Sequence, residues 1–342
     1  MEQRFLGRSG LQVSVIGFGT MTFGGGESGG KFAAIGTTDL AQAKRQVALA
    51  LDHGVTLFDT ADNYADGHAE SLLGAALGTR RRDVVIATKA FGRTGPSTHD
   101  IGLSRRHLVS ACEASLRRLG TDWIDLYQVH NHDGLVPMEE TLRALDDLVR
   151  AGKVRHIGCS NHFAWQLAKA IGLSARHGLE SYVSQQILYS LAYRQAEQEL
   201  LPAALDHGVG TLVYSPLAQG YLSGKFADAG SEGRLLATRQ FAGTDTPHAR
   251  GIVAELARLA ASAGPGRTPS QLALAWLIGR PGISAVIVGA RSESQLRENL
   301  AAATTTLAAA ERTALEAASA IAPWYPRTAQ RVFHPERNPP ID

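Results

Sequence analysis

Short apolar runs recur along the chain, and longer stretches with apolar residues at helical spacing separate them. The runs lack the strict alternation of a sheet with one face in water, so they are typical of parallel strands covered on both faces. Eight such strands are predicted, at Val13–Gly17, Thr56–Asp59, Val84–Lys89, Ile124–His130, Val154–Cys159, Tyr182–Ile187, Thr211–Ser215 and Ser284–Val288.

Helical patterns lie between the predicted strands. Several of them stop at or next to a glycine, and Pro137 and Pro269 stand where a first helical turn tolerates proline. The predicted helices are Asp39–His53, His68–Gly78, Ser104–Leu119, Pro137–Arg150, Phe163–His177, Gln195–His207 and Pro269–Gly279, with a further one over Ser292–Asn299.

This alternation of strands and helices predicts an α/β fold with a parallel sheet that closes into a (β/α)8 TIM barrel. An open doubly wound sheet is the alternative, and it would carry a dinucleotide-binding glycine motif after its first strand. The segment from Gly17 has only two of the three glycines, because Thr22 replaces the third. We therefore expect one barrel domain over residues 1–342, since such barrels run from ~200 to over 400 residues.

Some segments fall outside this repeat. Phe5–Leu6 and Leu11–Val13 predict a short β-hairpin that plugs one end of the barrel. Residues 230–248 and the tail from Pro323 show no periodicity and are expected to be long loops at the C-terminal face, where loops of this length are usually functional.

A glycine-rich run covers residues 24–36. Gly25 to Lys31 fit the spacing of a phosphate-binding loop, but Phe32 stands where that loop needs a hydroxyl for Mg²⁺. No helical pattern begins there, so we expect a flexible loop at the rim of the barrel.

Charge and composition exclude several classes of protein. The chain has 34 Lys and Arg against 32 Asp and Glu, and it lacks the basic stripe of a nucleic-acid-binding protein. No apolar run reaches the length of a membrane-spanning helix, and no hydrophobic secretory segment follows Met1. Cys112 and Cys159 are too few for a disulfide framework and are expected to be free thiols in the reducing cytoplasm.

Ionisable residues end three consecutive predicted strands: Asp59, Lys89 and His130. The active site of a TIM barrel lies at the C-terminal ends of its strands, so these side chains should meet, with Tyr64 on the loop above Asp59. An ammonium lowers the pKa of a nearby phenol, so Lys89 could make Tyr64 a usable proton donor while Asp59 holds Lys89. His130 could donate to a substrate oxygen. This set suits the reduction of a carbonyl group.

A metal-dependent hydrolase is a competing interpretation of the same strand end. His130-Asn131-His132 has the H-x-H spacing of such enzymes. A hydrolytic metal site needs further ligands from later strands, and the sixth and eighth predicted strands end without His or Asp. We therefore expect no metal site.

Together with their surroundings, these residues resemble the aldo-keto reductase family, and most of all a bacterial branch that also resembles potassium-channel β-subunits. The matching segments cover nearly the whole chain, and their order fits as well as their residues. They are Leu6–Val13, Gly17–Gly24, Leu57–Tyr64, Ile86–Lys89, Asp125–His130, Gly158–Asn161, Tyr214–Leu217 and Gly289–Ser292, followed by Gln295, Glu298 and Asn299.

The resemblance implies reduction of an aldehyde or ketone by NADPH, which would bind in extended form without a Rossmann fold. The implied catalytic tetrad, in which Tyr64 is the general acid, is Asp59, Tyr64, Lys89 and His130. The implied cofactor contacts are Thr20, Met21, Asp59, Ser160, Asn161, Gln186, Tyr214, Ser215, Pro216, Leu217, Gly220, Leu222, Lys225, Gly289, Arg291, Gln295 and Asn299.

These contacts divide between the two ends of the cofactor. Ser160, Asn161 and Gln186 match positions that hold the nicotinamide carboxamide, and Tyr214 matches the residue that stacks on the nicotinamide ring. Residues 215–225 match the loop over the pyrophosphate, and residues 289–299 match the site of the adenine and the 2′-phosphate. Ser160-Asn161 could instead only cap the next helix, and Ser292 could only start one, although a helix N-terminus also binds anions.

The substrate is expected to be a small carbonyl compound in the cytoplasm, and the sequence assigns no oligomeric state. Candidate walls of its pocket lie beside strand ends: Met21, Phe23, Tyr64, Phe91 and His130. A nicotinamide-binding regulatory or channel-associated module is the alternative function. Such a module would oxidise its tightly held NADPH in one slow turnover. An enzyme would instead reduce simple aldehydes over many turnovers.

Overall fold

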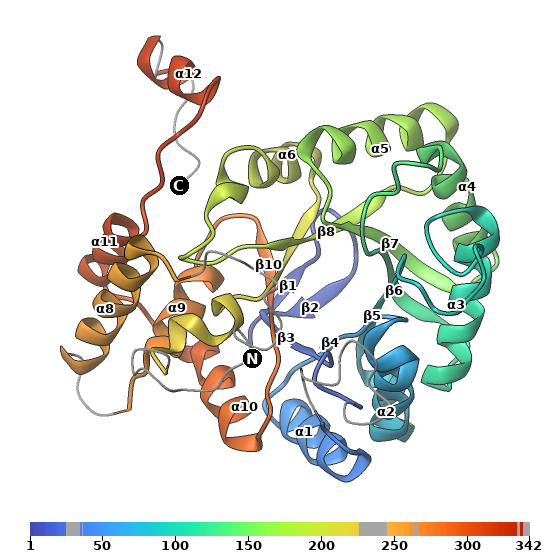
Figure 1. Ribbon diagram of the computed structural model, residues 1–342, viewed down its shortest axis with the longest axis horizontal. Helices are drawn as coiled ribbons and strands as arrows, with labels where there is room; N and C mark the ends of the chain where they lie inside the picture. The colour runs from blue at the N-terminus through green and yellow to red at the C-terminus, as the bar shows by residue number, and fades with distance from the viewer. Residues whose placement is uncertain (25–34, 36, 226–244, 263–265, 334–335, 338–342) are drawn as a thin grey trace.

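The computed structural model describes residues 1–24, 35, 37–225, 245–262, 266–333 and 336–337. Its centre is a closed barrel of parallel strands in the order β10-β3-β4-β5-β6-β7-β8-β9, surrounded by helices (Figure 1). The predicted TIM barrel is thereby confirmed. The strands are β3 (Ile16–Gly19), β4 (Leu57–Asp59), β5 (Val85–Ala90), β6 (Ile124–Val129), β7 (Val154–Ser160), β8 (Tyr182–Leu188), β9 (Gly210–Tyr214) and β10 (Ile283–Val288).

Side chains cap the N-termini of several helices. Asp39 accepts a hydrogen bond from the backbone nitrogen of Gln42 at 2.7 Å and caps the first helix, and Thr268 forms a capping box with Gln271. The α-helices are α1 (Leu40–Asp52), α2 (His68–Leu77), α3 (Arg105–Leu119), α4 (Met138–Arg150), α5 (Ala164–His177), α6 (Leu200–His207), α8 (Pro247–Ser262), α9 (Pro269–Ile278), α10 (Glu293–Leu300), α11 (Ala309–Ala318) and α12 (Arg327–Phe333).

Short 3-10 helices lie between several of these elements. They are η3 (Tyr64–Gly67), η4 (Gly78–Asp83), η5 (Gln195–Glu197), η6 (Ala218–Ser223) and η7 (Ala301–Thr304). Among the residues described, no helix has both the length and the apolar character to cross a bilayer.

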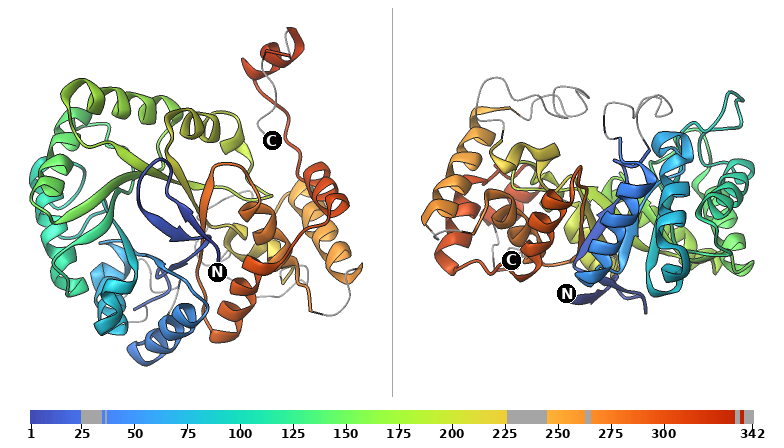
Figure 2. Two further views of the ribbon diagram at one scale, coloured as in Figure 1. Left: turned by 180° about the vertical axis from the view of Figure 1, so that it is seen from behind. Right: turned by 90° about the horizontal axis from the view of Figure 1, so that it is seen from below.

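The predicted hairpin is formed by β1 (Gln3–Phe5) and β2 (Gln12–Ser14), which pair antiparallel. Seen from behind, it lies across one opening of the barrel (Figure 2). Leu6 and Val13 join the small core inside the barrel, and Gly7 permits the close approach, because a Cβ there would lie 2.5 Å from the Gly208 carbonyl oxygen. The hairpin therefore closes the end opposite the strand termini that carry the predicted site.

The structure corrects the first strand. Val13 belongs to the hairpin, and the barrel strand starts only at Ile16, from which the chain pairs with β10 and β4. The backbone nitrogen of Val15 still donates to the Glu2 carbonyl at 3.1 Å. No glycine, proline or charged residue separates Val13 from Ile16, so the pattern of residues could not reveal this change of partner.

Three predictions outside the barrel were also wrong in part. The helix expected from Gln195 begins only at Leu200, because Pro202 lacks an N–H and is tolerated only in a first turn. Residues 230–244 of the expected loop lie outside the described residues, but α8 already starts at Pro247. The tail from Pro323 contains α12, and the helices α8 and α11 were not predicted at all.

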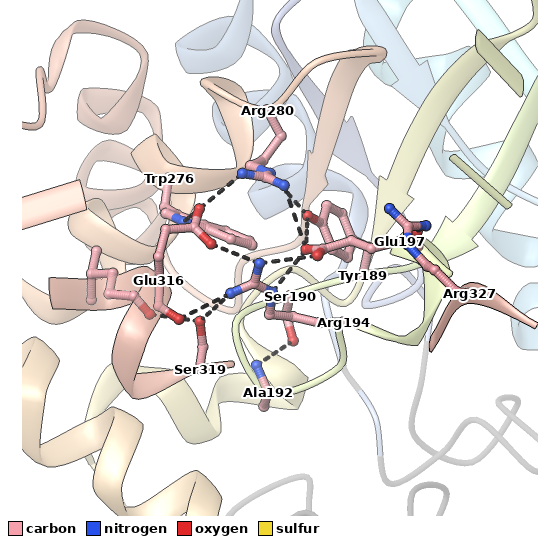
Figure 3. A network of polar contacts seen from close by, with 11 residues as sticks. Tyr189, Ser190, Ala192, Arg194, Glu197, Trp276, Arg280, Glu316, Ser319 and Arg327 are labelled. Carbon is pink, nitrogen blue, oxygen red and sulfur yellow. Dashed lines mark hydrogen bonds and ion pairs between the residues drawn. The ribbon is translucent and has the colours of Figure 1, made fainter. Parts of the chain in front are cut away.

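A network of ion pairs and aromatic contacts ties α11 to the rest of the molecule (Figure 3). Arg194 pairs with Glu197 at 2.8 Å and with Glu316 of α11 at 2.6 Å. Arg280 also pairs with Glu316, at 2.8 Å, and the two guanidinium groups lie 5.1 and 5.2 Å from the ring centre of Trp276. Two arginines and two glutamates thus balance in charge around one buried indole.

Removing one partner of this network should be costly, because it leaves a poorly solvated charge behind. We expect Arg194→Met to lower the free energy of unfolding by about 3 kcal/mol in denaturant titrations. The exposed Arg258, which pairs with Glu255 on one helix face, is the matched control, and Arg258→Met should cost under about 1 kcal/mol. Equal losses in the two variants would contradict the role given to the network.

The loss of stability in Arg194→Met should depend on pH because of the carboxyl group of Glu197. Burial alone would raise the pKa of its carboxyl, but hydrogen bonds from Arg194 and Tyr189 outweigh burial, and the pKa is lowered. A carboxyl group whose pKa is lower in the folded protein than in the unfolded chain stabilises the fold at any pH above its unfolded pKa. This stabilisation is lost as the pH falls through the pKa of the folded state. The difference in free energy of unfolding between wild type and Arg194→Met should therefore become smaller at acidic pH.

Candidate active site

The four predicted catalytic residues meet at the C-terminal mouth of the barrel. Asp59 ends β4, Lys89 lies one residue before the end of β5, His130 follows β6 and Tyr64 opens η3. The ammonium of Lys89 donates to Asp59 Oδ1 at 2.6 Å and lies 5.1 Å from the centre of the Tyr64 ring. The Tyr64 ring meets that of His130 edge to face, with 5.9 Å between centres.

Lys89 is held as a cation although it is 0% exposed. Burial alone would lower its pKa, but the Asp59 carboxylate and the Tyr64 hydroxyl oppose burial, and the pKa is raised above the ordinary lysine value. Lys89 also donates to the Thr60 carbonyl at 2.7 Å. The second carboxylate oxygen of Asp59 accepts from Gln186 Nε2 at 2.8 Å, so both oxygens of Asp59 are fixed.

The turn between Asp59 and Tyr64 is attached along β5. The backbone nitrogen of Thr60 donates to the Ala87 carbonyl at 2.9 Å, and that of Asp62 donates to the Lys89 carbonyl at 3.0 Å. These two bonds continue the barrel ladder past the end of β4. They fix the height at which Tyr64 leaves the barrel above Lys89.

A buried polar cluster behind β5 was not predicted. Glu70 of α2 accepts from Thr88 Oγ1 at 2.5 Å and from Arg118 Nε at 2.7 Å. Asp62 is buried beside it, and burial, followed by the charge of Glu70, raises the pKa of its carboxyl well above the usual value. The only signal in the sequence was the position of Glu70 on the inner side of the predicted second helix.

The backbone of His130 is held from both sides. Its nitrogen donates to the Ala90 carbonyl at 2.9 Å, and its carbonyl accepts from Asn161 Nδ2 at 3.0 Å. The other histidine of the H-x-H spacing, His132, packs instead against the rings of His162 and Trp165. Within the ranges the structure describes, no three His, Cys, Asp or Glu side chains come together as a metal site would need.

The residues predicted for the nicotinamide end surround the same mouth. Ser160 Oγ donates to the Gln186 carbonyl at 3.0 Å, and Asn161 follows with a positive φ of 54°. Tyr214, the last residue of β9, donates from its hydroxyl to Asn161 Oδ1 at 2.8 Å. Thr20 lies against the tetrad, since its nitrogen donates to the Asp59 carbonyl at 2.8 Å.

A cleft of about 280 Å³ contains most of the residues predicted for the pyrophosphate and adenosine. Leu222 is an exception, because its side chain is fully buried in the core. Thr22, Gln219, Ser223, Ser270 and Glu298 line the cleft but were not predicted; most of them are neighbours of predicted residues. The predicted residues in the lining are Ser215, Pro216, Leu217, Gly220, Lys225, Gly289, Arg291, Gln295 and Asn299.

Arg291 stands at the start of α10, beside this cleft. Its backbone nitrogen donates to Gln295 Oε1 at 2.9 Å, and Ser292 caps the helix through the nitrogen of Gln295 at 3.2 Å. Arg291 is exposed, and no carboxylate in the described part of the chain pairs with its guanidinium. Arg291, which pairs with no described carboxylate, therefore lines the cleft beside the N-terminus of α10.

The candidate substrate walls differ in their exposure. Phe23 is 1% exposed and packs edge to face on Phe18, with 5.8 Å between ring centres, so it belongs to the core and does not line an open pocket. Phe91 is partly buried against the same core, and Met21 is partly exposed at the mouth. The glycine-rich run from Gly25 to Ala34 lies outside the described residues.

The chain is similar to one protein family and to several known proteins over most of its length. The model of the aldo/keto reductase family matches residues 15–320. A "Probable voltage-gated potassium channel subunit beta" of Arabidopsis thaliana is 37% identical over 314 residues, which is 88% of this chain and 91% of that protein. The "Uncharacterized oxidoreductase YrpG" of Bacillus subtilis (strain 168) is 38% identical over 324 residues, again 88% of this chain and 91% of that protein.

Proposed function

Because this chain belongs to the aldo/keto reductase family of oxidoreductases, we propose that it reduces small aldehydes or ketones to alcohols in the cytoplasm, with NADPH as the hydride donor. One observation carries this proposal: a buried, cationic Lys89 lies between Asp59 and the ring of Tyr64 at the mouth of the barrel. That arrangement supplies a proton donor beside a fixed positive charge, which carbonyl reduction requires.

The catalytic work of the chain is acid catalysis and positioning. NADPH, when bound, supplies a hydride to the carbonyl carbon, and the carbonyl oxygen then gains negative charge. Tyr64 donates its hydroxyl proton to that oxygen, and Lys89 stabilises the phenolate that forms. His130 donates a hydrogen bond to the same oxygen, and Asp59 holds Lys89 in place.

The cleft supports the choice of cofactor. Its lining includes two cationic side chains, Lys225 and Arg291, which suit a ligand with a pyrophosphate and a separate phosphate group. Gln219 also lines it, and neither polar atom of its buried amide has a hydrogen-bond partner among the residues described. The cleft begins next to Ser215, which follows the Tyr214 of the nicotinamide end, so an extended dinucleotide would run from the tetrad to α10.

The preference for NADPH over NADH should depend on Arg291. The two cofactors differ only in the 2′-phosphate, so discrimination must come from groups that touch it. A hydrogen bond to a charged group contributes about 1.5–3 kcal/mol, so Arg291→Ala should raise the Kd of NADPH by about 10- to 150-fold and leave that of NADH nearly unchanged. Fluorescence titration of both cofactors measures this, and the preference should weaken as salt is added.

Arg297→Ala is the matched control, because Arg297 is an exposed arginine of the same helix and does not line the cleft. It should leave both affinities unchanged. If Arg291→Ala weakens NADPH and NADH equally, Arg291 acts through the adenine or the fold and not through the phosphate.

A second candidate function comes from the names of the relatives, three of which are named as probable or putative voltage-gated potassium channel β-subunits. A regulatory module that binds the cofactor without rapid turnover would share this site. A panel of aldehydes and ketones, followed by NADPH absorbance, separates the two. Continuous turnover supports the enzyme, whereas a single slow oxidation of bound NADPH supports the module.

A further inference from the structure

A chain of hydrogen bonds links three strand ends at the mouth of the barrel. The hydroxyl of Tyr214, at the end of β9, donates to Asn161 Oδ1 at 2.8 Å. The amide nitrogen of the same Asn161 donates to the His130 carbonyl at 3.0 Å. One side-chain amide therefore joins β9 to the end of β6, and the His130 ring in turn meets the Tyr64 ring edge to face.

These two bonds select one orientation of the Asn161 amide. The oxygen faces a donor and the nitrogen faces an acceptor. In the flipped orientation the amide oxygen would meet the His130 carbonyl oxygen and the amide nitrogen would meet the hydroxyl. The amide then presents one remaining N–H and one remaining lone pair in fixed directions, which matches the donor and acceptor of a carboxamide.

The backbone beneath this amide is fixed as well. Asn161 has a left-handed φ of 54°, which asparagine tolerates better than most residues. Its nitrogen donates to the Gln186 carbonyl at 3.2 Å, and Ser160 Oγ donates to the same carbonyl at 3.0 Å. With the backbone held, the remaining freedom of Asn161 lies in its side chain, on which Tyr214 acts.

We infer that the Tyr214 hydroxyl is a positioning group, which locks the Asn161 amide so that it holds the carboxamide of the cofactor and the backbone of His130 at the same time. This inference rests on the proposed function, because it names the cofactor that the amide would read. It is separate from any stacking by the Tyr214 ring, since a phenyl ring would stack equally well.

The hydroxyl is a permanent donor across the working pH range. Burial, and after it the neighbouring Tyr64, raises the pKa of Tyr214 to about 12. The locking bond should therefore act equally at pH 6 and pH 9. A defect in it should lower activity without moving the pH profile, unlike a defect at Lys89.

A double-mutant cycle on NADPH affinity tests this role. Tyr214→Phe removes one neutral hydrogen bond and should raise the Kd of NADPH by about 2- to 10-fold, and lower the single-turnover rate, at all pH values. In the background of Asn161→Gly, which tolerates the positive φ, Tyr214→Phe should have no further effect. Equal effects in both backgrounds would show that the hydroxyl does not act through Asn161 and would overturn the inference.

A second measurement needs no cofactor. The side-chain amide signals of Asn161 in the NMR spectrum of the free protein should move in Tyr214→Phe, because the amide loses a partner. They should not move in Tyr127→Phe, which loses a hydroxyl bonded to the Leu108 carbonyl at 3.4 Å, away from the mouth. Unchanged signals in Tyr214→Phe would also overturn the inference.

The outcomes distinguish this inference from the proposed function. If wild type does not bind NADPH while the Asn161 signals respond to Tyr214→Phe, the proposed function fails, and with it the contact to the cofactor carboxamide; only the positioning of the Asn161 amide by the hydroxyl stands. If wild type binds and turns over but neither the cycle nor the signals respond, the proposed function stands and the lock fails.

Discussion

Tyr64→Phe is expected to lower the rate of carbonyl reduction by at least about 100-fold, which is the usual contribution of a general acid. The phenyl ring keeps its place between Lys89 and His130, so the affinity for NADPH should barely change. Steady-state reduction of an aldehyde gives the rate, and fluorescence titration gives the affinity. Near-normal turnover in a folded Tyr64→Phe protein would remove Tyr64 from the reaction and with it the proposed tetrad.

The matched control is Tyr182→Phe. Tyr182 is buried at the first residue of β8, and its ring meets that of His162 edge to face, with 6.0 Å between centres. This variant also loses a phenolic hydroxyl, from a position more buried than that of the half-buried Tyr64, so a general effect of the loss on folding would appear in it too. We expect its activity to stay close to wild type.

Lys89→Met is the second change with a large expected effect, because it removes the charge that stabilises the Tyr64 phenolate in the proposed mechanism. Activity should fall strongly. In the proposed mechanism reduction requires the protonated form of Tyr64, so the rate should fall as the pH rises through the pKa of that phenol. Without the ammonium the phenol returns toward its ordinary pKa of about 10, and the alkaline limb of the pH–rate profile should move to higher pH.

The same substitution affects stability for a different reason. Asp59 is 3% exposed and loses the ammonium at 2.6 Å, and breaking a buried pair costs about 3–5 kcal/mol. The double variant Asp59→Asn, Lys89→Met should recover much of this stability because no charge is left unpaired, but it should not recover activity. A folded Lys89→Met protein with an unchanged pH profile would show that Lys89 does not tune the acid.

A surface lysine provides the control for both measurements. Lys153 pairs with Glu113 outside the core, and both side chains are more than a third exposed. Lys153→Met should therefore leave the pH–rate profile unchanged. It should change the free energy of unfolding by less than about 1 kcal/mol.

The sequence by itself determined the barrel and the meeting of the four predicted catalytic residues at its mouth. Apolar runs without alternation require both faces of each strand to be covered, and repeated strand–helix units then close the sheet. Closure brings the last residues of all strands to one mouth. Asp59, Lys89 and His130 could therefore be placed together from their positions at strand ends, although they are far apart in the chain.

Only the tertiary structure decided which side chains meet across elements. Periodicity shows that a face is apolar, but it does not show which surface covers that face or where a strand changes partner, as at Val13–Ile16. The contacts of Arg194 with α11, of Glu70 with Arg118 and of Tyr214 with Asn161 each join residues from separate elements. Such contacts depend on distances set by packing, and packing is a property of the folded chain as a whole.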